Sequence, residues 1–541
     1  MAYQNLGESN FQLPVDFNLV QKASAPACTS RRVNVLPLSG GSFNPGDVAK
    51  FEVPCGINGQ YVDTTQTYLL IKVTNKDPSF YNMFVDGNAA CFIQKLEVYS
   101  SSMLIETIAG YNALFSALEN SQLGPLDRQG FLSITHGTDV DASEDTVNFT
   151  RSGINMFYGQ TYTFCIPLVS GVIGTGLSKM LPVGMLTDLR VELTFENNAN
   201  AVLSATPTSV ATPCWGITAA ELVLQVLTLN SEVNEMVASH KEPVVISSES
   251  FRNYNTVLNA SNTGDNTIIP LKFTSVKSLI NVYRLQNNQN TFNVSTITSR
   301  RNPFASSGTT VPNIQWLLGN VYAPAVPLRS TPEIFSEFQK SLHTLSNTNN
   351  KSTLNKQTYD NSAEPATTIS AQAVTGVSVL SVITVGSTSG YVIGQPIWFF
   401  IPGGGALTNN VYVAGNGTII PTTYYISGIF SATTLTVSLT TYGYSTLIAQ
   451  PNVFSAVGLT CVTTTNYCQQ TPSFVMGLNL DTMYQSSTTC MSGINSNAGN
   501  VFMNSIYSAA TPAGGQRLDI WAHYDHLLII DPQTKQMTVR I

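Results

Sequence analysis

The chain has 541 residues, of which only 11% are charged and 43% are hydrophobic, and its formal net charge is −7. A chain of this length can bury enough apolar surface for two or more domains. The negative charge does not favour direct nucleic-acid binding, and Arg31-Arg32 and Arg300-Arg301 are predicted to lie in solvated loops rather than in a basic patch.

The first segment, residues 1–30, shows weak periodicity and contains Pro14 and Pro26. We expect an N-terminal arm that orders only against neighbouring molecules. No basic stretch followed by an apolar run is visible, so no signal peptide is predicted, and no run reaches the roughly 20 apolar residues of a membrane span. The eight cysteines are therefore expected to be reduced thiols in a protein made in a reducing cell interior.

The next segment, residues 31–240, alternates short β runs with turn residues. Tyr111, Leu114, Phe115 and Leu118 share one face at helical spacing and predict a helix in the middle of this segment. The predicted strands, rich in β-branched and aromatic residues, are 32–38, 48–53, 67–73 and 91–99 before the helix, and 160–168, 189–196 and 222–229 after it.

The second half, residues 241–541, repeats that order of elements. Its helix is predicted to begin at Thr331, with Thr331 as the cap, Pro332 at the first helical position and an apolar face of Ile334, Phe335, Phe338 and Leu342. The predicted strands are 244–248, 267–273, 278–285 and 314–321 before the helix, and 473–478, 502–507 and 518–530 near the C-terminus. Two similar sets of short strands favour an all-β fold with two tandem eight-stranded jelly rolls and short helices.

An uncharged block interrupts the second half. Residues 365–480 contain no Asp, Glu, Lys or Arg, yet Val, Ile, Phe and Tyr recur throughout, which disorder does not predict. We expect a small β insert at 366–460, in a loop of the second jelly roll, that forms an outer tower. Residues 393–397, 424–429 and 433–438 (IGQPI, YYISGI and TTLTVS) resemble small β modules of phage and virion surface proteins.

Two further stretches carry a family resemblance. Residues 164–196 contain the turn FCIPLVSGVIG followed by LPVGMLTDLRVELTFE, and residues 517–531 read RLDIWAHYDHLLIID before a final strand at 536–541. They resemble the double jelly-roll major capsid proteins of tailless double-stranded DNA viruses, in the branch of polinton-like viruses, adintoviruses and virophages. The resemblance reaches most of the chain except the arm and the insert.

The resemblance implies a structural protein, not an enzyme, that needs no cofactor. It would form pseudo-hexagonal homotrimers, the capsomers, that tile an icosahedral virion shell. The implied partners are neighbouring capsomers, penton and minor capsid proteins, and a host receptor contacted through the insert. Synthesis would take place in the host cytoplasm. The sequence leaves open the shell size, the host and an internal membrane.

Several motifs suggest chemistry, but each has a structural interpretation that we favour. Gly171–Lys179 lacks the spacing of a phosphate-binding loop and is predicted to connect two strands. On a strand, His523 and Asp525 share one face while His526 points to the other, so one metal ion cannot readily bind all three. Cys461 and Cys468 do not fit common zinc spacings. We therefore predict no metal, cofactor or catalytic residue.

Two other functions remain as alternatives. A carbohydrate-binding or adhesin-like β protein would use aromatic side chains of the insert, such as Tyr424-Tyr425 and Tyr442 with Tyr444, although strand packing is the interpretation that we favour for them. A glycoside hydrolase would need two carboxylates facing a cleft. The acidic residues Asp139, Asp141, Glu144 and Asp145 instead lie in a stretch rich in Ser and Thr, which predicts a solvated loop.

Overall fold

The structure is a computed structural model. It describes residues 28–541 apart from 78–82, 139–152, 178, 205–212, 231–234, 236–241, 293–294, 306–309, 346–351, 361–367, 378–381, 390, 401–411, 414–423, 439–447, 450–459, 466–472, 483–490 and 498. The predicted arm at residues 1–30 falls outside the described residues except for its last three, which begin the first strand.

Two four-stranded sheets form the first jelly roll. The pairing order is β1-β11-β3-β8 in one sheet and β2-β9-β5-β6 in the other. Side chains from both sheets meet in one hydrophobic core. The strands are β1 Cys28–Val35, β2 Val48–Glu52, β3 Gln60–Asn75, β5 Ile93–Ser100, β6 Met103–Ala109, β8 Thr161–Pro167, β9 Arg190–Phe195 and β11 Trp215–Leu229, with a small side sheet of β4 Met83–Val85, β7 Asn155–Met156 and β10 Val202–Ser204.

The second jelly roll is built in the same way. Its sheets have the orders β12-β27-β14-β25, with β28 beside β27, and β13-β26-β15-β16. The strands are β12 Val244–Leu258, β13 Gly264–Ile269, β14 Val276–Leu285, β15 Asn313–Leu318, β16 Val321–Leu328, β25 Met476–Asn479, β26 Val501–Ile506, β27 Gln516–Asp531 and β28 Gln536–Arg540.

The two units share one strand order. When the main strands of each unit are counted along the chain, both have one sheet of the first, eighth, third and sixth strands and another of the second, seventh, fourth and fifth. This antiparallel arrangement is that of a jelly roll. The predicted fold of two tandem eight-stranded jelly rolls is therefore confirmed.

Burial along the strands follows their place in the layers. In β9, every second residue is buried, as expected for a strand with one face on the core. In β14, nine of ten residues are buried and the remaining one, Lys277, is half-buried. A strand buried on both faces reads as a nearly continuous apolar run. β14 has this pattern because one face packs on its own core and the other faces the first jelly roll.

A helix follows the fifth main strand of each unit. α1 (Tyr111–Gln122) confirms the first predicted helix, and Tyr111, Leu114 and Phe115 are buried on its core side. α5 (Thr331–Ser341) confirms the second, but its cap is Ser330 rather than Thr331, because the Ser330 hydroxyl accepts a hydrogen bond from the Glu333 backbone N–H. The shorter helices are α2 Pro125–Gln129, α3 Phe131–Thr135 and α6 Lys356–Tyr359, with 3-10 turns at Ala89–Phe92, Val183–Met185 and Gln286–Asn288.

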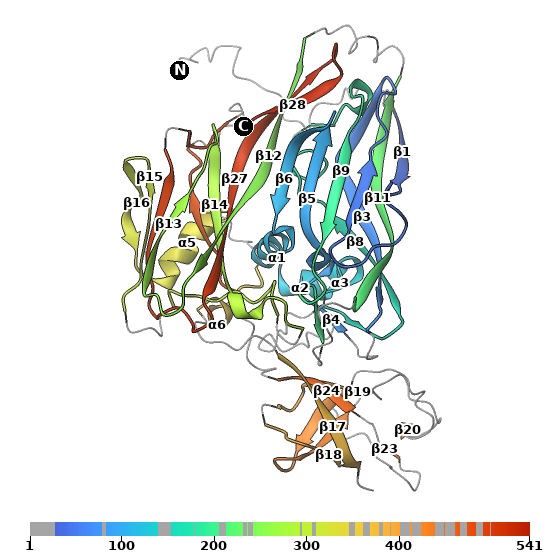
Figure 1. The fold of residues 1–541 in the computed structure, drawn as a ribbon, viewed down its shortest axis with the longest axis vertical. Coiled ribbons are helices and arrows are strands. Elements are labelled where there is room, and N and C mark those ends of the chain that lie inside the picture. The colour runs from blue at the N-terminus through green and yellow to red at the C-terminus, as the bar shows by residue number, and fades with distance from the viewer. Residues whose placement is uncertain are drawn as a thin grey trace, which may run out of the picture.

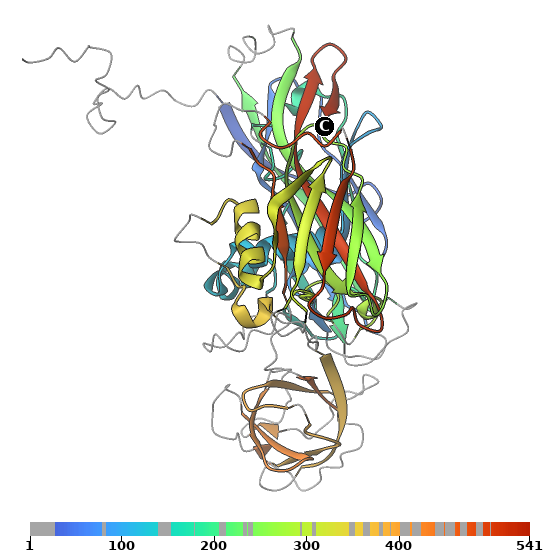
Figure 2. The same cartoon turned by 90° about the vertical axis from the view of Figure 1, so that its left-hand side faces the viewer.

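The insert forms a separate closed barrel with the strand order β17-β18-β22-β21-β19-β24. Its own core contains Val374, Ile397, Ile426 and Leu435, and the expected inserted β module is thus confirmed (Figure 2). Its strands are β17 Thr368–Val377, β18 Ile383–Val385, β19 Pro396–Phe400, β21 Tyr424–Ile429, β22 Thr434–Ser438 and β24 Thr460–Thr465, with a short pair of β20 Tyr412–Val413 and β23 Ile448–Ala449.

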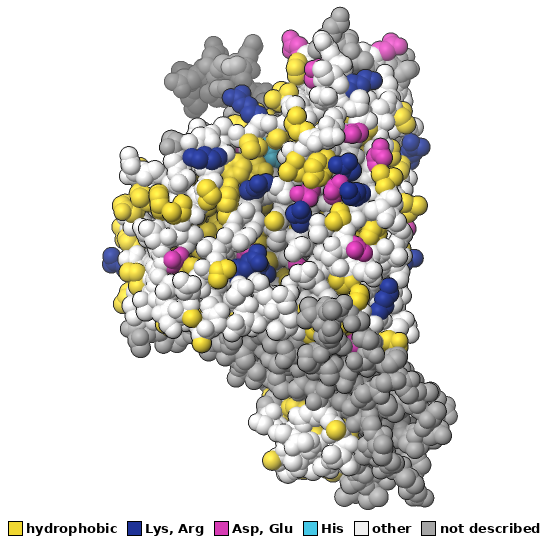
Figure 3. Space-filling model, in the orientation of Figure 1, with side chains coloured by type: hydrophobic (Ala, Val, Ile, Leu, Met, Phe, Trp, Pro, Cys, Tyr) yellow, Lys and Arg dark blue, Asp and Glu magenta, His cyan; other side chains and the backbone are white. Residues whose placement is uncertain are grey.

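The two jelly rolls stand side by side, with the insert at one end and the C-terminus toward the opposite end (Figure 1). The sheet with β15 and β16 forms one flank, and the sheet with β1, β11 and β3 forms the other. Uncharged side chains cover most of the face in Figure 3. Within the described part of the chain, no helix is long and apolar enough to cross a membrane.

Candidate functional site: the junction between the two jelly rolls

The two jelly rolls meet along an extended contact, which we call the junction. From the first jelly roll it contains β6, α1 and the connection 169–177 after β8. From the second it contains the outer face of the sheet with β12, β27 and β14. The junction therefore joins unlike surfaces of two similar units.

Glu106 on β6 is a buried carboxylate at the centre of the junction. Its Oε1 accepts a hydrogen bond from the Gly171 backbone N–H at 2.7 Å and another from the Ser250 hydroxyl on β12. The Ser170 hydroxyl donates to its other oxygen. Burial raises the pKa of Glu106, and these hydrogen bonds oppose that rise. One acidic side chain thus connects β6, the 169–177 connection and the second jelly roll.

The 169–177 connection lies directly against β12. The Glu249 backbone N–H donates to the Gly176 carbonyl at 3.0 Å, and Leu177 forms a β-bridge with Ser248. A Cβ atom on Gly171 would lie 2.5 Å from the Glu249 carbonyl oxygen, which is too close for any other residue. The stretch predicted to connect two strands does lie between β8 and β9, and the structure adds that its backbone approaches that of β12 closely.

A second carboxylate joins the units near β4. Asp86 is buried, and its Oδ2 accepts from the backbone N–H groups of Thr296 at 2.9 Å and Ile297 at 2.7 Å. Its Oδ1 accepts from the hydroxyls of Ser295 at 2.7 Å and Thr298 at 2.6 Å. Four donors from one loop of the second jelly roll thus satisfy a carboxylate of the first, as a buried charge requires.

Trp521 closes the junction beside the start of α1. Its indole Nε1–H donates to the Ala109 carbonyl at 3.1 Å. Gly110, which lies between Ala109 and the first residue of α1, adopts a φ of +61°. A Cβ atom on Gly110 would lie 3.3 Å from the Trp521 ring. A glycine at this turn lets β6 run into α1 while the tryptophan packs against the backbone.

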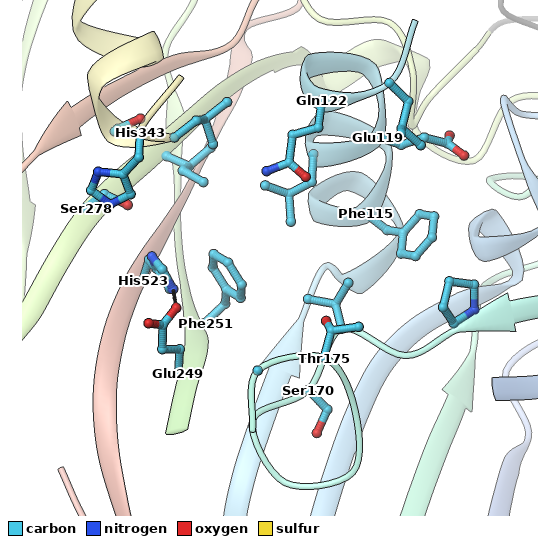
Figure 4. Close-up of a pocket in the computed structure, with 18 of the residues that line it drawn as sticks. Phe115, Glu119, Gln122, Ser170, Thr175, Glu249, Phe251, Ser278, His343 and His523 are labelled. Atoms are coloured by element: carbon cyan, nitrogen blue, oxygen red, sulfur yellow. Dashed lines mark hydrogen bonds and ion pairs between the residues drawn. The ribbon is translucent and has the colours of Figure 1, made fainter. Parts of the chain in front are cut away.

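A cavity of about 590 Å³ opens within the junction, between α1, the end of α5 and the sheet of β12, β27 and β14 (Figure 4). Its wall is largely apolar, with Phe115, Leu118, Phe251 and Ile280 among the lining residues. Glu249, Ser278, His343 and His523 form its polar side. The rings of Phe251 and His523 stack with centroids 4.6 Å apart.

An ion-pair network lies at the polar side of the cavity. His523 Nε2 lies 3.1 Å from Glu249 Oε2, and Lys277 Nζ lies 2.5 Å from Glu249 Oε1 and 3.7 Å from Asp525 Oδ1. The hydrogen bond from His523, supported by Lys277, lowers the pKa of Glu249 to about 2. This network links β12, β14 and β27 on the side of the sheet that faces the cavity.

The strand period places the histidine motif as expected. His523 and Asp525 join the same network, whereas His526 is fully buried away from it. Neither ring nitrogen of His526 has a hydrogen-bond partner among the described residues, and burial lowers its pKa to about 4. Among the described residues, no group of three His, Cys, Asp or Glu side chains could hold a metal ion.

The expectation of solvated loops was wrong for the two arginine pairs. Arg31 and Arg32 are exposed, but they lie on strand β1. Arg300 is fully buried and Arg301 is 7% exposed, since the chain at this point pairs with Ser473, where the insert rejoins the second jelly roll. Burial lowers the pKa of Arg300 to about 9. Sequence alone did not reveal that this segment is covered.

Two of the insert tyrosines do not form an exposed sugar-binding platform. Tyr424 and Tyr425 are both buried, as strand packing predicts, and Tyr424 belongs to the core of the barrel. Tyr442, Tyr444 and the acidic residues Asp139, Asp141, Glu144 and Asp145 lie outside the described residues. The same holds for Cys468 and for the side chain of Cys461. The cysteines whose side chains the structure describes are buried or half-buried, namely Cys28, Cys55, Cys91, Cys165 and Cys214.

No sequence pattern identified the junction residues Glu106, Asp86, Glu249 and Lys277. Their partners lie far away along the chain, with separations of 144 residues for Glu106 and Ser250 and 209 for Asp86 and Ser295. One local signal existed, because Glu106 is an acidic residue within the apolar run of β6. An acidic residue in such an apolar run indicates either that its side chain lies on an exposed face of the strand or that its carboxylate has a buried hydrogen-bond partner.

No protein-family model matches this sequence, and a search of curated proteins gives no match. Solved structures do match along nearly the whole chain. A chain from the structure of the Sputnik virophage is 10% identical, with a TM-score of 0.48, and the match covers 100% of this chain and 93% of that chain. The match to PBCV-1 VP54 has 11% identity and a TM-score of 0.46 and covers 97% and 99% of the two chains.

The mavirus major capsid protein is 8% identical, with a TM-score of 0.43, over 100% of this chain and 97% of its own. The matches thus include viral major capsid proteins, as the sequence resemblance predicted. All three TM-scores lie below 0.5. The assignment of the double jelly roll rests on the strand order described above.

Proposed function

We propose that this chain is a structural major capsid protein that forms pseudo-hexagonal homotrimers, the capsomers, and tiles an icosahedral shell. The observation that carries the proposal is the junction between two units of identical strand order. The role of the protein is assembly rather than catalysis, and its functional surfaces are those that contact other copies of the chain.

The junction has the geometry of a repeating contact. It joins the β6 side of the first jelly roll to the β12-β27-β14 face of the second, and so it is heterologous. The surfaces that correspond to the two sides of the junction are the β16 side of the second jelly roll and the β1-β11-β3 face of the first. They lie on opposite flanks of the molecule (Figure 1). A heterologous contact repeated between chains closes into a ring when its rotation permits, and three chains would then present six jelly rolls.

The remaining parts of the chain fit this proposal. The insert stands at the end of the molecule away from the C-terminus, where it would form a tower and could contact a receptor (Figure 1). Neighbouring capsomers, penton proteins and minor capsid proteins would bind the sides and the opposite end. Synthesis in the host cytoplasm would precede assembly into the virion.

The mass of the purified chain tests the proposal. We expect sedimentation equilibrium to give a particle of three times 58.3 kDa, and negative-stain images to show outlines with six lobes. A chain that stays monomeric at every concentration up to the solubility limit contradicts the proposal. A monomer that binds glycans would instead favour the carbohydrate-binding alternative.

A further inference from the structure

Arg300 is a fully buried charged side chain directly after the loop that binds Asp86. Its exposed fraction is 0%. Among the described residues, no hydrogen-bond acceptor reaches its Nε, Nη1 or Nη2 atom. A guanidinium group carries five N–H donors, and buried donors of folded proteins are nearly always paired. Arg300 is an exception to this rule, and its unpaired donors point to an acceptor that the chain itself does not supply.

The backbone on both sides of this side chain holds it in its buried position. The Arg300 carbonyl accepts a hydrogen bond from the Phe474 backbone N–H at 2.9 Å, within a parallel β-bridge to Ser473. The next residue, Arg301, donates its backbone N–H to the Tyr283 carbonyl on β14 at 3.0 Å. The Arg300 side chain cannot reach solvent unless these contacts break, so its charge requires compensation inside the protein.

Asp86 does not supply the missing acceptor. Its negative charge acts on Arg300 and favours the charged form of the guanidinium group. Each of its two oxygens, however, already accepts two hydrogen bonds from residues 295–298. Since a carboxylate has about four lone-pair positions, none remains for the Arg300 donors.

The other described charges that act on Arg300 are positive. Burial is the main cause that lowers the pKa of Arg300 to about 9, and the cations Arg284 and Arg128 act in the same direction. Arg284 pairs with Asp519 at 2.6 Å, but Arg517 shares the same carboxylate at 2.9 Å. The neighbouring arginines therefore add to the cost of the buried charge on Arg300 and favour an anion beside it.

We propose that Arg300 binds a small monovalent inorganic anion of the chloride type where the two jelly rolls meet. The anion would accept hydrogen bonds from guanidinium nitrogens that have no other acceptor, and it would supply a negative charge. A monovalent ion fits this enclosed position better than sulfate or phosphate, because the cost of removing an ion from water rises steeply with its charge. Arg300 and Arg284 belong to the second jelly roll, whereas Asp86 and Arg128 belong to the first. The ion would therefore stabilise the contact between the two units, in a monomer as well as in a trimer.

Urea unfolding of the full chain in different salts tests this site. We expect the ratio of folded to unfolded chains to rise with sodium chloride, by about tenfold for each tenfold increase once the ion saturates the site. Sodium gluconate at the same pH and ionic strength should lack this effect, because its anion is too large for an enclosed position. A wild-type protein that is equally stable in both salts would overturn the inference.

A substitution of Arg300 assigns the chloride effect to this residue. Arg300→Met keeps much of the length of the side chain without its charge, and it should abolish the difference between chloride and gluconate. Arg31→Met is the matched control, since Arg31 is exposed on β1 and its loss should leave the chloride effect intact. An Arg300→Met protein that keeps the effect would overturn the inference. Chloride-dependent stability in a chain that sediments as a monomer would support this site and contradict only the proposed function.

Anomalous diffraction gives a second readout that does not depend on the folding of a variant. Bromide replaces chloride and scatters anomalously, so crystals of the wild-type chain grown in sodium bromide should show an anomalous peak beside the Arg300 guanidinium group. Ordered water alone at this position would overturn the assignment of an anion. A bromide peak without any halide-dependent stability would indicate an adventitious ion only and would also overturn it.

Discussion

At the scale of single residues, the junction depends on buried carboxylates that several donors satisfy. Glu106 accepts from Ser170, Gly171 and Ser250, and Asp86 accepts from four donors of the 295–298 loop. Since a buried donor without an acceptor costs more than a hydrogen bond contributes, the loss of either acid should weaken the contact between the units.

Glu106→Ala removes the shared acceptor of these three donors. We expect the free energy of unfolding to fall by about 3 kcal/mol, because two hydroxyls and one backbone N–H remain buried without a partner. Urea denaturation at fixed protein concentration measures the change. Glu52→Ala is the control, since Glu52 is exposed and its loss should change stability by less than about 0.5 kcal/mol. Equal effects would contradict the role of Glu106.

His526→Leu tests the buried histidine. Because the folded pKa of about 4 lies below the ordinary value of 6.5, the folded protein binds this proton more weakly than the unfolded chain does. The resulting stability is fully present above pH 6.5 and is lost as the pH falls toward 4, by about 3 kcal/mol in total. We expect the variant to lack this part of the acid sensitivity when both proteins are denatured with urea at pH 7 and pH 4.5. Identical losses would contradict the prediction.

At the scale of elements, the sequence predicted most strands but missed the fifth main strand of each unit. β6 and β16 are these strands, and both lie at a sheet edge. β6 carries Glu106 in an apolar run, and β16 carries Pro324 and Pro327, which usually argue against a strand. The local sequence pattern does not predict these two edge strands. The acidic residue of β6 is tolerated because tertiary partners cover it, and the prolines of β16 are tolerated because an edge strand needs hydrogen-bond donors on one side only.

Gly171→Ala tests the close approach of the 169–177 connection to β12. The new methyl group would meet the Glu249 carbonyl and the Ser248 hydroxyl, so the two units must separate. We expect a loss of about 3 kcal/mol in the free energy of unfolding. Gly41→Ala is the control, since no atom lies within 4 Å of its Cβ position. A stable Gly171→Ala protein would show that the junction tolerates a wider gap.

At the scale of the whole molecule, the insert has a hydrophobic core of its own, separate from those of the two jelly rolls. The insert closes its own barrel, and its first and last strands pair from Thr368 with Thr465 onward, so its ends lie close together. Such an element can be removed with little strain on the chain that carries it.

Replacement of residues 368–465 by a short Gly-Ser linker should therefore leave the double jelly roll folded. We expect circular dichroism to keep its β signature and the melting temperature to change by only a few degrees. Sedimentation should still report the oligomer of the full chain, because the proposed contacts lie outside the insert. A deletion variant that unfolds would show that the insert supports the second jelly roll.

The sequence by itself determined the class of the fold, the two helices, the uncharged β insert and most strands, because these depend on local periodicity and turn residues. It also placed His523 and Asp525 on one face, since strand geometry alternates side chains. Only the tertiary structure decided the junction and the burial of Arg300. Each of these depends on residues far apart in the chain that become neighbours only when the sheets pair and pack.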